Sequence, residues 1–135
     1  MSRNWAQLSI CGLLFGLTLC SCKSVNPFIS SPSSVAKRFF MNCNAGDYSK
    51  ASEELSTDER KTFQVEPGEV SGRFKSVCDL ISRNGTITSV EMVNENIRGE
   101  GAVVNMKIHY KDGSTVDDQE LFIKEKGSWL LTTRQ

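Results

Sequence analysis

The chain has 135 residues, in which 16 Lys and Arg balance 16 Asp and Glu, so that the formal net charge is zero. This length suits one domain with a modest hydrophobic core. The charges are interspersed, and this pattern argues against nucleic acid or a strongly basic protein as the partner. A single histidine excludes most histidine-based metal sites.

The N-terminus has the pattern of a secretory signal. Arg3 and the terminal amine precede Leu8–Cys20, a run of 13 residues that is apolar apart from Ser9 and Thr18. A transmembrane helix needs about 20 such residues, so the run is too short to span a bilayer. A short apolar run behind a positive start is typical of a signal peptide.

The run ends as Leu-Cys-Ser-Cys at residues 19–22, which resembles the bacterial lipobox. The resemblance implies that Cys22 receives a diacylglyceryl group, carries acyl chains such as palmitate, and becomes the mature N-terminus after residues 1–21 are removed. Cys20 is the weaker candidate because the bulky Leu19 precedes it. An uncleaved anchor is the alternative, whereas a Cys-x-Cys metal or redox pair lacks a second ligand pair.

A lipidated Cys22 predicts where the protein resides. The acyl chains would hold it on a membrane while its domain remains in water. By resemblance to enterobacterial sorting, Lys23 after the lipidated residue favours the outer membrane facing the periplasm over the inner membrane. Residues 22–31 comprise the lipidated Cys and a Ser-rich segment that we expect to be a flexible tether.

Residues 32–135 form the predicted domain, which begins with helices. Ser31 and Pro32 have the residue types of an N-cap and a first helical position. Apolar residues then recur on one helical face as far as Gly46. We expect three helices: one at 32–45, a short one capped by Asp47, and one at 69–83. One additional helical turn is expected at 58–63.

From Thr86 onward the apolar period changes from helical to two. Four strands are expected, at 86–94, 100–110, 115–124 and 128–133. Asp112-Gly113 is a strong signal for a two-residue hairpin turn. The fold class is therefore α+β, with three N-terminal helices packed on one face of an antiparallel four-stranded meander.

Two stretches resemble a known superfamily. The sequence NAGDYSKA at 44–51 lies among the helices, and the final meander closes on KGSWLL at 126–131. This order resembles the nuclear-transport-factor-two-like (cystatin-like cone) superfamily, and in particular its small bacterial lipoproteins that carry a domain of unknown function. The resemblance implies a curved sheet wrapped around a long helix, forming a cone that often holds a pocket. Some members are isomerases or dehydratases and many are non-catalytic, so the fold does not decide the function.

The acidic side chains and the single histidine are the candidate catalytic groups. Strand alternation places His109 on the face away from the helices, and it sends the adjacent Asp117 and Asp118 to opposite faces. Asp117 is the acid expected to face the helices, near the hairpin end of its strand. Asp47 fits a helix cap. We therefore expect no catalytic residue, no metal ligand and no cofactor.

Cys43 and Cys78 lie on the apolar faces of their helices, and two interpretations remain open. In an oxidising envelope they could form a disulfide that closes a loop of about 36 residues and stabilises by roughly 4 kcal/mol. Alternatively they are two buried thiols that act as small hydrophobic residues.

Six residues are expected to line the inside of the cone: Phe39, Phe40, Phe74, Met106, Tyr110 and Trp129. They could form either an ordinary core or a ligand pocket. We expect a non-catalytic envelope lipoprotein that binds a protein or a small ligand. The alternative is a cone-pocket isomerase or lyase that acts on a small hydrophobic substrate. An ionisable side chain inside a sizeable cavity would favour the enzyme.

The hairpin turns fix which side chains face outward. A two-residue turn at Asp112-Gly113 and a three-residue loop at 125–127, chosen because it buries Trp129, leave one apolar row on the face away from the helices. The predicted row consists of Val103, Phe122 and Leu130. Such a row on a solvent face predicts a homodimer or envelope-protein contact, and a small tolerated patch is the alternative.

Overall fold

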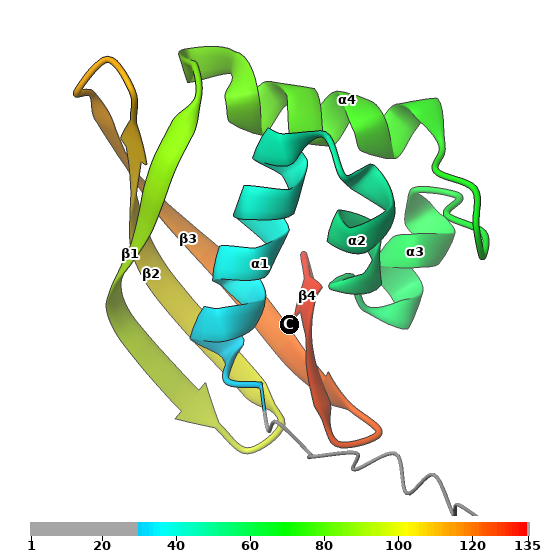
Figure 1. Cartoon of the computed structure of the whole chain (residues 1–135). Coiled ribbons are helices and arrows are strands. Elements are labelled where there is room, and N and C mark those ends of the chain that lie inside the picture. The colour runs from blue at the N-terminus through cyan, green and yellow to red at the C-terminus, as the bar shows by residue number, and fades with distance from the viewer. Residues whose placement is uncertain (1–29, 135) are drawn as a thin grey trace, which may run out of the picture.

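The computed structural model describes residues 30–134, so Cys22 and most of the tether lie outside the described residues. Four helices come first: α1 (Pro32–Ala45), α2 (Tyr48–Glu53), α3 (Thr57–Thr62) and α4 (Gly72–Ile81). A 3₁₀ turn at Ser82–Asn84 leads to four strands: β1 (Ile87–Arg98), β2 (Gly101–Tyr110), β3 (Thr115–Glu125) and β4 (Ser128–Thr132). The strands form one antiparallel sheet in chain order. Figure 1 shows that the helices cover one face of this curved sheet, with α1 along it and α4 across one end.

The α+β class and the four-stranded meander are confirmed, but the helices number four rather than three. The expected extra turn is the separate helix α3, because Ser56 caps it by accepting a hydrogen bond from the Glu59 backbone N–H. The helix dipole is complemented by acids in the first turn and bases in the last turn. Among residues 30–134 no helix has the length and apolar character needed to span a bilayer.

Helix α1 lies against the sheet and is anchored at both ends. Ser31 forms the capping box at its start, and Gly46 ends it in the left-handed conformation, with φ 75°. The carboxylate of Glu95 on β1 accepts a hydrogen bond of 2.7 Å from the Ser33 backbone N–H. A negative charge at this position also complements the helix dipole.

The core lies between α1, α4 and the inner face of the sheet. Phe39 and Phe40 of α1 are 3% and 1% exposed, and Phe74 of α4 is fully buried. The rings of Phe39 and Phe40 meet edge to face with centroids 5.6 Å apart. Aromatic burial of this kind supplies the largest apolar areas in a small core.

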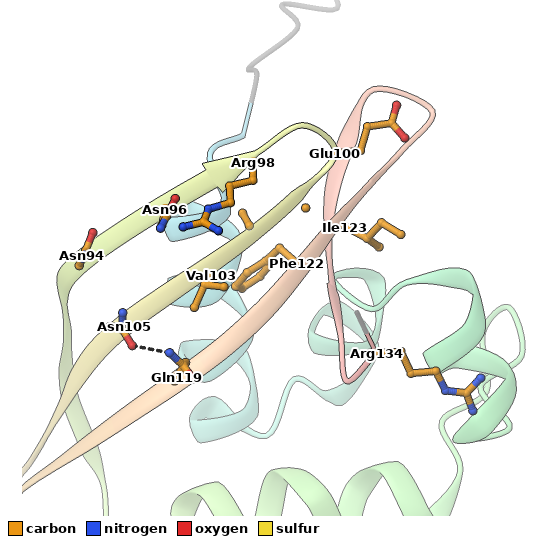
Figure 2. Close-up of a pocket in the computed structure, with 12 residues that line it drawn as sticks. Asn94, Asn96, Arg98, Glu100, Val103, Asn105, Gln119, Phe122, Ile123 and Arg134 are labelled. Atoms are coloured by element: carbon orange, nitrogen blue, oxygen red, sulfur yellow. Dashed lines mark hydrogen bonds between the residues drawn. The ribbon is translucent and has the colours of Figure 1, made fainter.

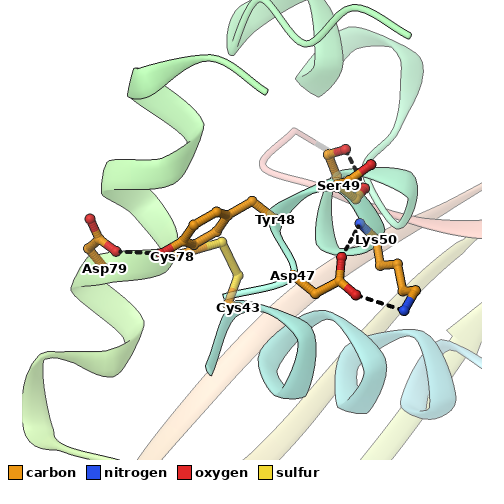
Figure 3. The surroundings of a disulfide bond; sticks show 8 residues. Cys43, Asp47, Tyr48, Ser49, Lys50, Cys78 and Asp79 are labelled. Atoms are coloured by element: carbon orange, nitrogen blue, oxygen red, sulfur yellow. Dashed lines mark hydrogen bonds and ion pairs between the residues drawn. A yellow bond between two sulfur atoms is a disulfide. The ribbon is translucent and has the colours of Figure 1, made fainter. Parts of the chain in front are cut away.

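A disulfide between Cys43 and Cys78 joins α1 to α4, as Figure 3 shows. The two Cα atoms are 4.8 Å apart and the two residues are separated by 35 positions in the sequence. Next to it the Tyr48 hydroxyl donates to Asp79 Oδ1 of α4 at 3.2 Å. The disulfide and this hydrogen bond both hold α4 in place over the end of the sheet.

The turn between β2 and β3 differs from the prediction. It is a three-residue loop, Lys111–Gly113, in which Tyr110 N donates to Ser114 O at 2.9 Å and Gly113 N donates to Tyr110 O at 3.0 Å. Gly113 has φ 87°, a conformation that glycine adopts without steric cost. The predicted two-residue turn at Asp112-Gly113 is therefore wrong.

The turn between β3 and β4 differs in the opposite sense. Lys126 and Gly127 form a two-residue turn with φ 49° and 84°, between the paired residues Glu125 and Ser128. Left-handed conformations at both positions match the twist of a tight hairpin. The predicted three-residue loop at 125–127 is wrong, although Trp129 is buried as expected, with 6% of its surface exposed.

The first turn shifts β3 by one position relative to β2, and a one-residue shift exchanges the two faces of a strand. Phe122 therefore faces the helices, pairs with Ala102 and Leu131, and is 2% exposed. Val103 lies opposite Leu121 instead of Phe122. The predicted outward row of Val103, Phe122 and Leu130 is corrected accordingly.

Candidate binding site

A pocket of about 320 Å³ opens between α1, α4 and the inner face of the sheet. Most of its walls are apolar, and the polar groups among its lining residues are Asn84, Tyr110, Asp118, Glu120 and Thr133. The apolar lining residues are Phe39, Phe40, Leu55, Phe63, Phe74, Val77, Leu80, Ile81, Ile108, Val116 and Leu131. This combination of apolar walls with a few polar groups is typical of small-ligand sites.

Asp118 and Glu120 reach this pocket because they share the inward parity of β3. They alternate with residues of the outer face and lie four and two positions before the buried Phe122. Asp118 pairs with Met106 and Glu120 pairs with Val104. Both partners are buried, at 1% and 0% exposure, so the two carboxylates stand on an apolar surface.

Burial shifts the protonation of both carboxylates. It raises the pKa of Asp118, although the Gln119 backbone N–H, which donates to Asp118 Oδ1 at 2.8 Å, opposes the rise. Burial and then the nearby Asp118 charge raise the pKa of Glu120 from 4.5 to about 7. Asp118 ionises first, and its charge disfavours the second ionisation. At neutral pH the pocket therefore contains one carboxylate and one carboxyl group that titrates.

The phenol of Tyr110 is fixed at the same pocket. Its hydroxyl donates to the Ile81 carbonyl at the end of α4, at 3.2 Å. This hydrogen bond orients the ring and joins β2 to α4. The Tyr110 hydroxyl proton is thereby committed to a backbone partner.

A second hollow, a groove of about 670 Å³, lies on the opposite face of the sheet. Figure 2 shows Asn94, Asn96 and Arg98 along β1, and Asn105 hydrogen-bonded to Gln119 across β2 and β3. Asn94, Asn105 and Gln119 form one row across three strands. These groups are exposed or half-buried, so water satisfies them as readily as a ligand. For this reason we regard the smaller inner pocket as the stronger candidate binding site.

Only four of the six residues expected to line the cone are lining residues of the inner pocket. Phe39, Phe40, Phe74 and Tyr110 line the inner pocket, whereas Met106 and Trp129 are buried in the core outside its lining. The aromatic character of the pocket was therefore predictable, but its extent was not.

The prediction that Asp117 faces the helices is wrong. Asp117 faces outward, where its carboxylate lies 4.0 Å from Lys107 Nζ with 84% of the side chain exposed. His109 is on the outer face as expected, and its Nε2 lies 2.8 Å from Glu91 Oε2. Among residues 30–134 no group of three or more His, Cys, Asp and Glu is placed to hold a metal ion.

The acids of the pocket were not identified from the sequence. The alternation of Val116, Asp118, Glu120 and Phe122 is visible in the chain, but alternation alone does not say which set faces the helices. A hairpin register counted from a three-residue loop ending at Gly113 would have found Glu120. The apolar character of Phe122 within this set was the available signal.

The corrected outer face also has an apolar row. Ile123 lies between Gly101 and Leu130 in the register, and it is 38% exposed. The neighbouring row contains Val103 and Leu121.

Comparisons with known proteins support the fold. A protein-family model described as Domain of unknown function (DUF4878) matches residues 24–132. A structure described as that of an NTF2-like transpeptidase from Campylobacter jejuni has a TM-score of 0.62 and 18% identity, and the match covers 78% of this chain and 100% of that chain. A SEC-C motif containing protein from Rhodopseudomonas palustris has a TM-score of 0.56 and 13% identity, with 77% of each chain covered. A comparison with curated protein sequences gives no significant match.

The first of the two structural matches shows that the domain has the NTF2-like fold, as the sequence resemblance implied.

Proposed function

The chain belongs to the family described as Domain of unknown function (DUF4878), and we propose that it is a lipid-anchored binding protein of the bacterial cell envelope. Because the family description names no role, the proposal is argued from the residues of this chain. Its NTF2-like domain binds a small molecule in the inner pocket and does not transform it. The observation that carries this proposal is the pocket itself, with its aromatic walls and two carboxylates on β3.

The anchor follows from the lipobox-like residues 19–22. Lipidation of Cys22 places the domain at the membrane surface, joined to it by the short segment before Pro32. Lys23 favours the outer membrane by the sorting resemblance. Fractionation of cells by density should place the full-length protein with outer-membrane markers, and recovery with inner-membrane markers would contradict this location.

The binding role is tested with the full-length protein in nanodiscs of zwitterionic lipid. The pocket volume of about 320 Å³ equals about ten waters, so a probe of similar size, 4-phenylbutanol, is suitable. Calorimetry against empty nanodiscs should detect binding at one site. Val77 lines the pocket and is half-buried, and Val77→Phe should abolish the binding by filling the space.

The matched control is Val93→Phe, on the β1 bulge at a position that is 61% exposed. It adds the same side chain away from the pocket and should leave the binding unchanged. No binding by the wild-type protein, or binding that survives Val77→Phe, would contradict the binding role of this pocket.

A cone-pocket isomerase or lyase is the second candidate, and one observation favours it. The pKa of Glu120, raised to about 7 by burial and the Asp118 charge, suits a general base at neutral pH. Both cysteines of residues 30–134 are joined in the disulfide, so neither provides a thiol nucleophile. An enzyme of this kind would therefore act by proton transfer.

Deuterium exchange distinguishes the two candidates. The protein is incubated with 4-phenyl-2-butanone in D₂O, and deuterium at the carbons next to the carbonyl is measured by mass spectrometry. A binding protein leaves the exchange at the buffer rate. Exchange that is accelerated by the wild-type protein and lost in Glu120→Gln would replace the binding proposal with the enzymatic one.

The outer apolar row is proposed as a contact with a second copy of the chain. Ile123 pairs with Leu130 on one side and with Gly101 on the other, and Gly101 has no side chain to shield Ile123 from another sheet. Exposed apolar side chains in a row favour a covered surface.

A further inference from the structure

The inner pocket has an unbalanced charge. The titratable groups that face it are Asp118 and Glu120 from β3 and Tyr110 from β2. Among residues 30–134 no Lys, Arg or His lines it, whether from the helices or from the strands packed around it. The site is therefore anionic whenever Asp118 or Glu120 is ionised. A charge on an apolar surface is costly unless a partner of opposite sign approaches it.

A second buried glutamate shows how this fold satisfies a carboxylate that serves the structure. Glu59 of α3 is 1% exposed, and its Oε1 accepts hydrogen bonds from the backbone N–H and the hydroxyl of Thr133, at 3.0 and 2.6 Å. These bonds attach α3 to the residue that follows β4. The carboxylate of Glu59 thus has hydrogen-bond partners within the domain.

Glu120 has no comparable role. Burial and the Asp118 charge are the two influences on its pKa, and no hydrogen bond from residues 30–134 contributes to it. Replacing the carboxylate by an uncharged group of the same size would cost the described part of the chain no hydrogen bond. A charged group that the fold does not use, on the wall of a pocket, indicates an external partner.

The two ends of the pocket differ in character. Phe39 and Phe74, at 3% and 0% exposure, provide the deep wall, whereas Leu80 and Val116, at 60% and 37%, lie at the rim. Asp118 and Glu120 are half-buried between these levels. A ligand that fits would place an apolar body against the aromatic rings and a donor group toward the carboxylates.

We infer that the inner pocket selects small organic cations, namely an ammonium group carried by an apolar body of about ten heavy atoms. This inference rests on the proposed function, because it specifies the ligand class of the same pocket. An ammonium group supplies the positive charge that both carboxylates lack and the N–H donors that Glu120 lacks. An anion of the same shape is repelled, and a neutral alcohol gains one hydrogen bond without the charge. A metal ion fits poorly, because only two carboxylates converge and apolar side chains surround them.

The experiment compares three probes that share one phenylbutyl body: 4-phenylbutylamine, 4-phenylbutanol and 4-phenylbutyrate. Calorimetry uses the full-length protein in zwitterionic nanodiscs at pH 8, with empty nanodiscs as the blank. We expect the amine to bind at least tenfold more tightly than the alcohol, and the carboxylate to bind more weakly than either. At pH 5.5 Glu120 is protonated, so the amine should lose affinity severalfold while the alcohol does not.

Variants of β3 locate the effect. Glu120→Gln should bring the affinity for the amine within about threefold of that for the alcohol, and Asp118→Asn should reduce the preference in the same direction. Asp117→Asn is the matched control, since it removes one acid from the same strand on the outer face, and it should change nothing. Thermal unfolding of each variant establishes that it is folded before it is titrated.

The outcomes separate this inference from the proposed function. Equal affinity for amine and alcohol, with both blocked by Val77→Phe, would overturn the cation selectivity and leave the binding pocket in place. Binding of none of the probes would overturn both. A preference for the amine that Asp117→Asn removes as effectively as Glu120→Gln would also overturn the inference, because a surface charge effect would then explain it.

Discussion

Replacing Glu120 by Gln should stabilise the protein at alkaline pH and leave it unchanged at acidic pH. Glu120 has a folded-state pKa of about 7, raised by burial and the Asp118 charge from an ordinary value of 4.5. Below about pH 4.5 the group is protonated in both the folded and the unfolded state, so it imposes no penalty. As the pH rises through 7, the folded state must accept a buried charge that the unfolded state accepts in water.

The size of the penalty follows from this rise. A change from 4.5 to about 7 corresponds to about 3 kcal/mol against the ionised folded state. Glu120 is not fully buried, so solvent screening reduces the expected effect to about 1–2 kcal/mol. The amide of Gln occupies the same volume and carries no charge. We therefore expect the unfolding free energy of Glu120→Gln to exceed that of the wild type by this amount at pH 8.

Thermal unfolding of the full-length protein, followed by circular dichroism in one detergent at pH 8 and pH 4.5, measures the difference. For a domain of this size about 1–2 kcal/mol corresponds to a rise in Tm of roughly 5–10 °C. Asp117→Asn on the outer face is the control and should shift Tm little at either pH. Equal Tm values for Glu120→Gln and wild type at pH 8, or the same gain at both pH values, would refute the assignment of Glu120 to a desolvated pocket.

Three further predictions concern the anchor, the disulfide and the outer face. Labelling cells with an alkyne fatty acid should tag the protein, and Cys22→Ala should remove the tag; a tag that survives would move or eliminate the lipidation site. The double replacement of Cys43 and Cys78 by Ala should lower the unfolding free energy by about 4 kcal/mol, because it releases a loop constrained in the unfolded chain; a loss below about 1 kcal/mol in urea unfolding would argue against that role. Ile123→Glu should shift a dimer to monomer in sedimentation of the detergent-solubilised protein while leaving its circular dichroism unchanged, and a wild type that is monomeric at high concentration would contradict the proposed contact. Phe122→Glu should instead unfold the domain, because that side chain lies in the core.

The sequence alone determined the features that depend on a few neighbouring residues. Ser31 and Gly46 bound α1 as predicted, and Asp47 caps α2, because capping is a contact between a side chain and a backbone group within one turn. The change from helical to two-residue periodicity located the four-stranded meander, since each period reflects how one element exposes its faces. The superfamily resemblance anticipated the fold for the same reason, as it relied on the order of these elements.

The tertiary structure alone decided which face of β3 points inward. A loop of three residues and a loop of two residues both satisfy the local sequence at Gly113, and the choice between them exchanges Asp117 with Asp118 and Ile123 with Phe122. The predicted lengths of the two hairpin loops are the reverse of the observed ones. The two errors cancel at β4, where Trp129 is buried as predicted, but they leave β3 with the wrong face toward the pocket. Burial of Phe122 in the core and the pairing of β3 with both β2 and β4 select the register. The core that buries Phe122 is built from residues far apart in the chain. The position of Glu120 in the pocket, and with it the chemistry proposed for this protein, is a consequence of that packing.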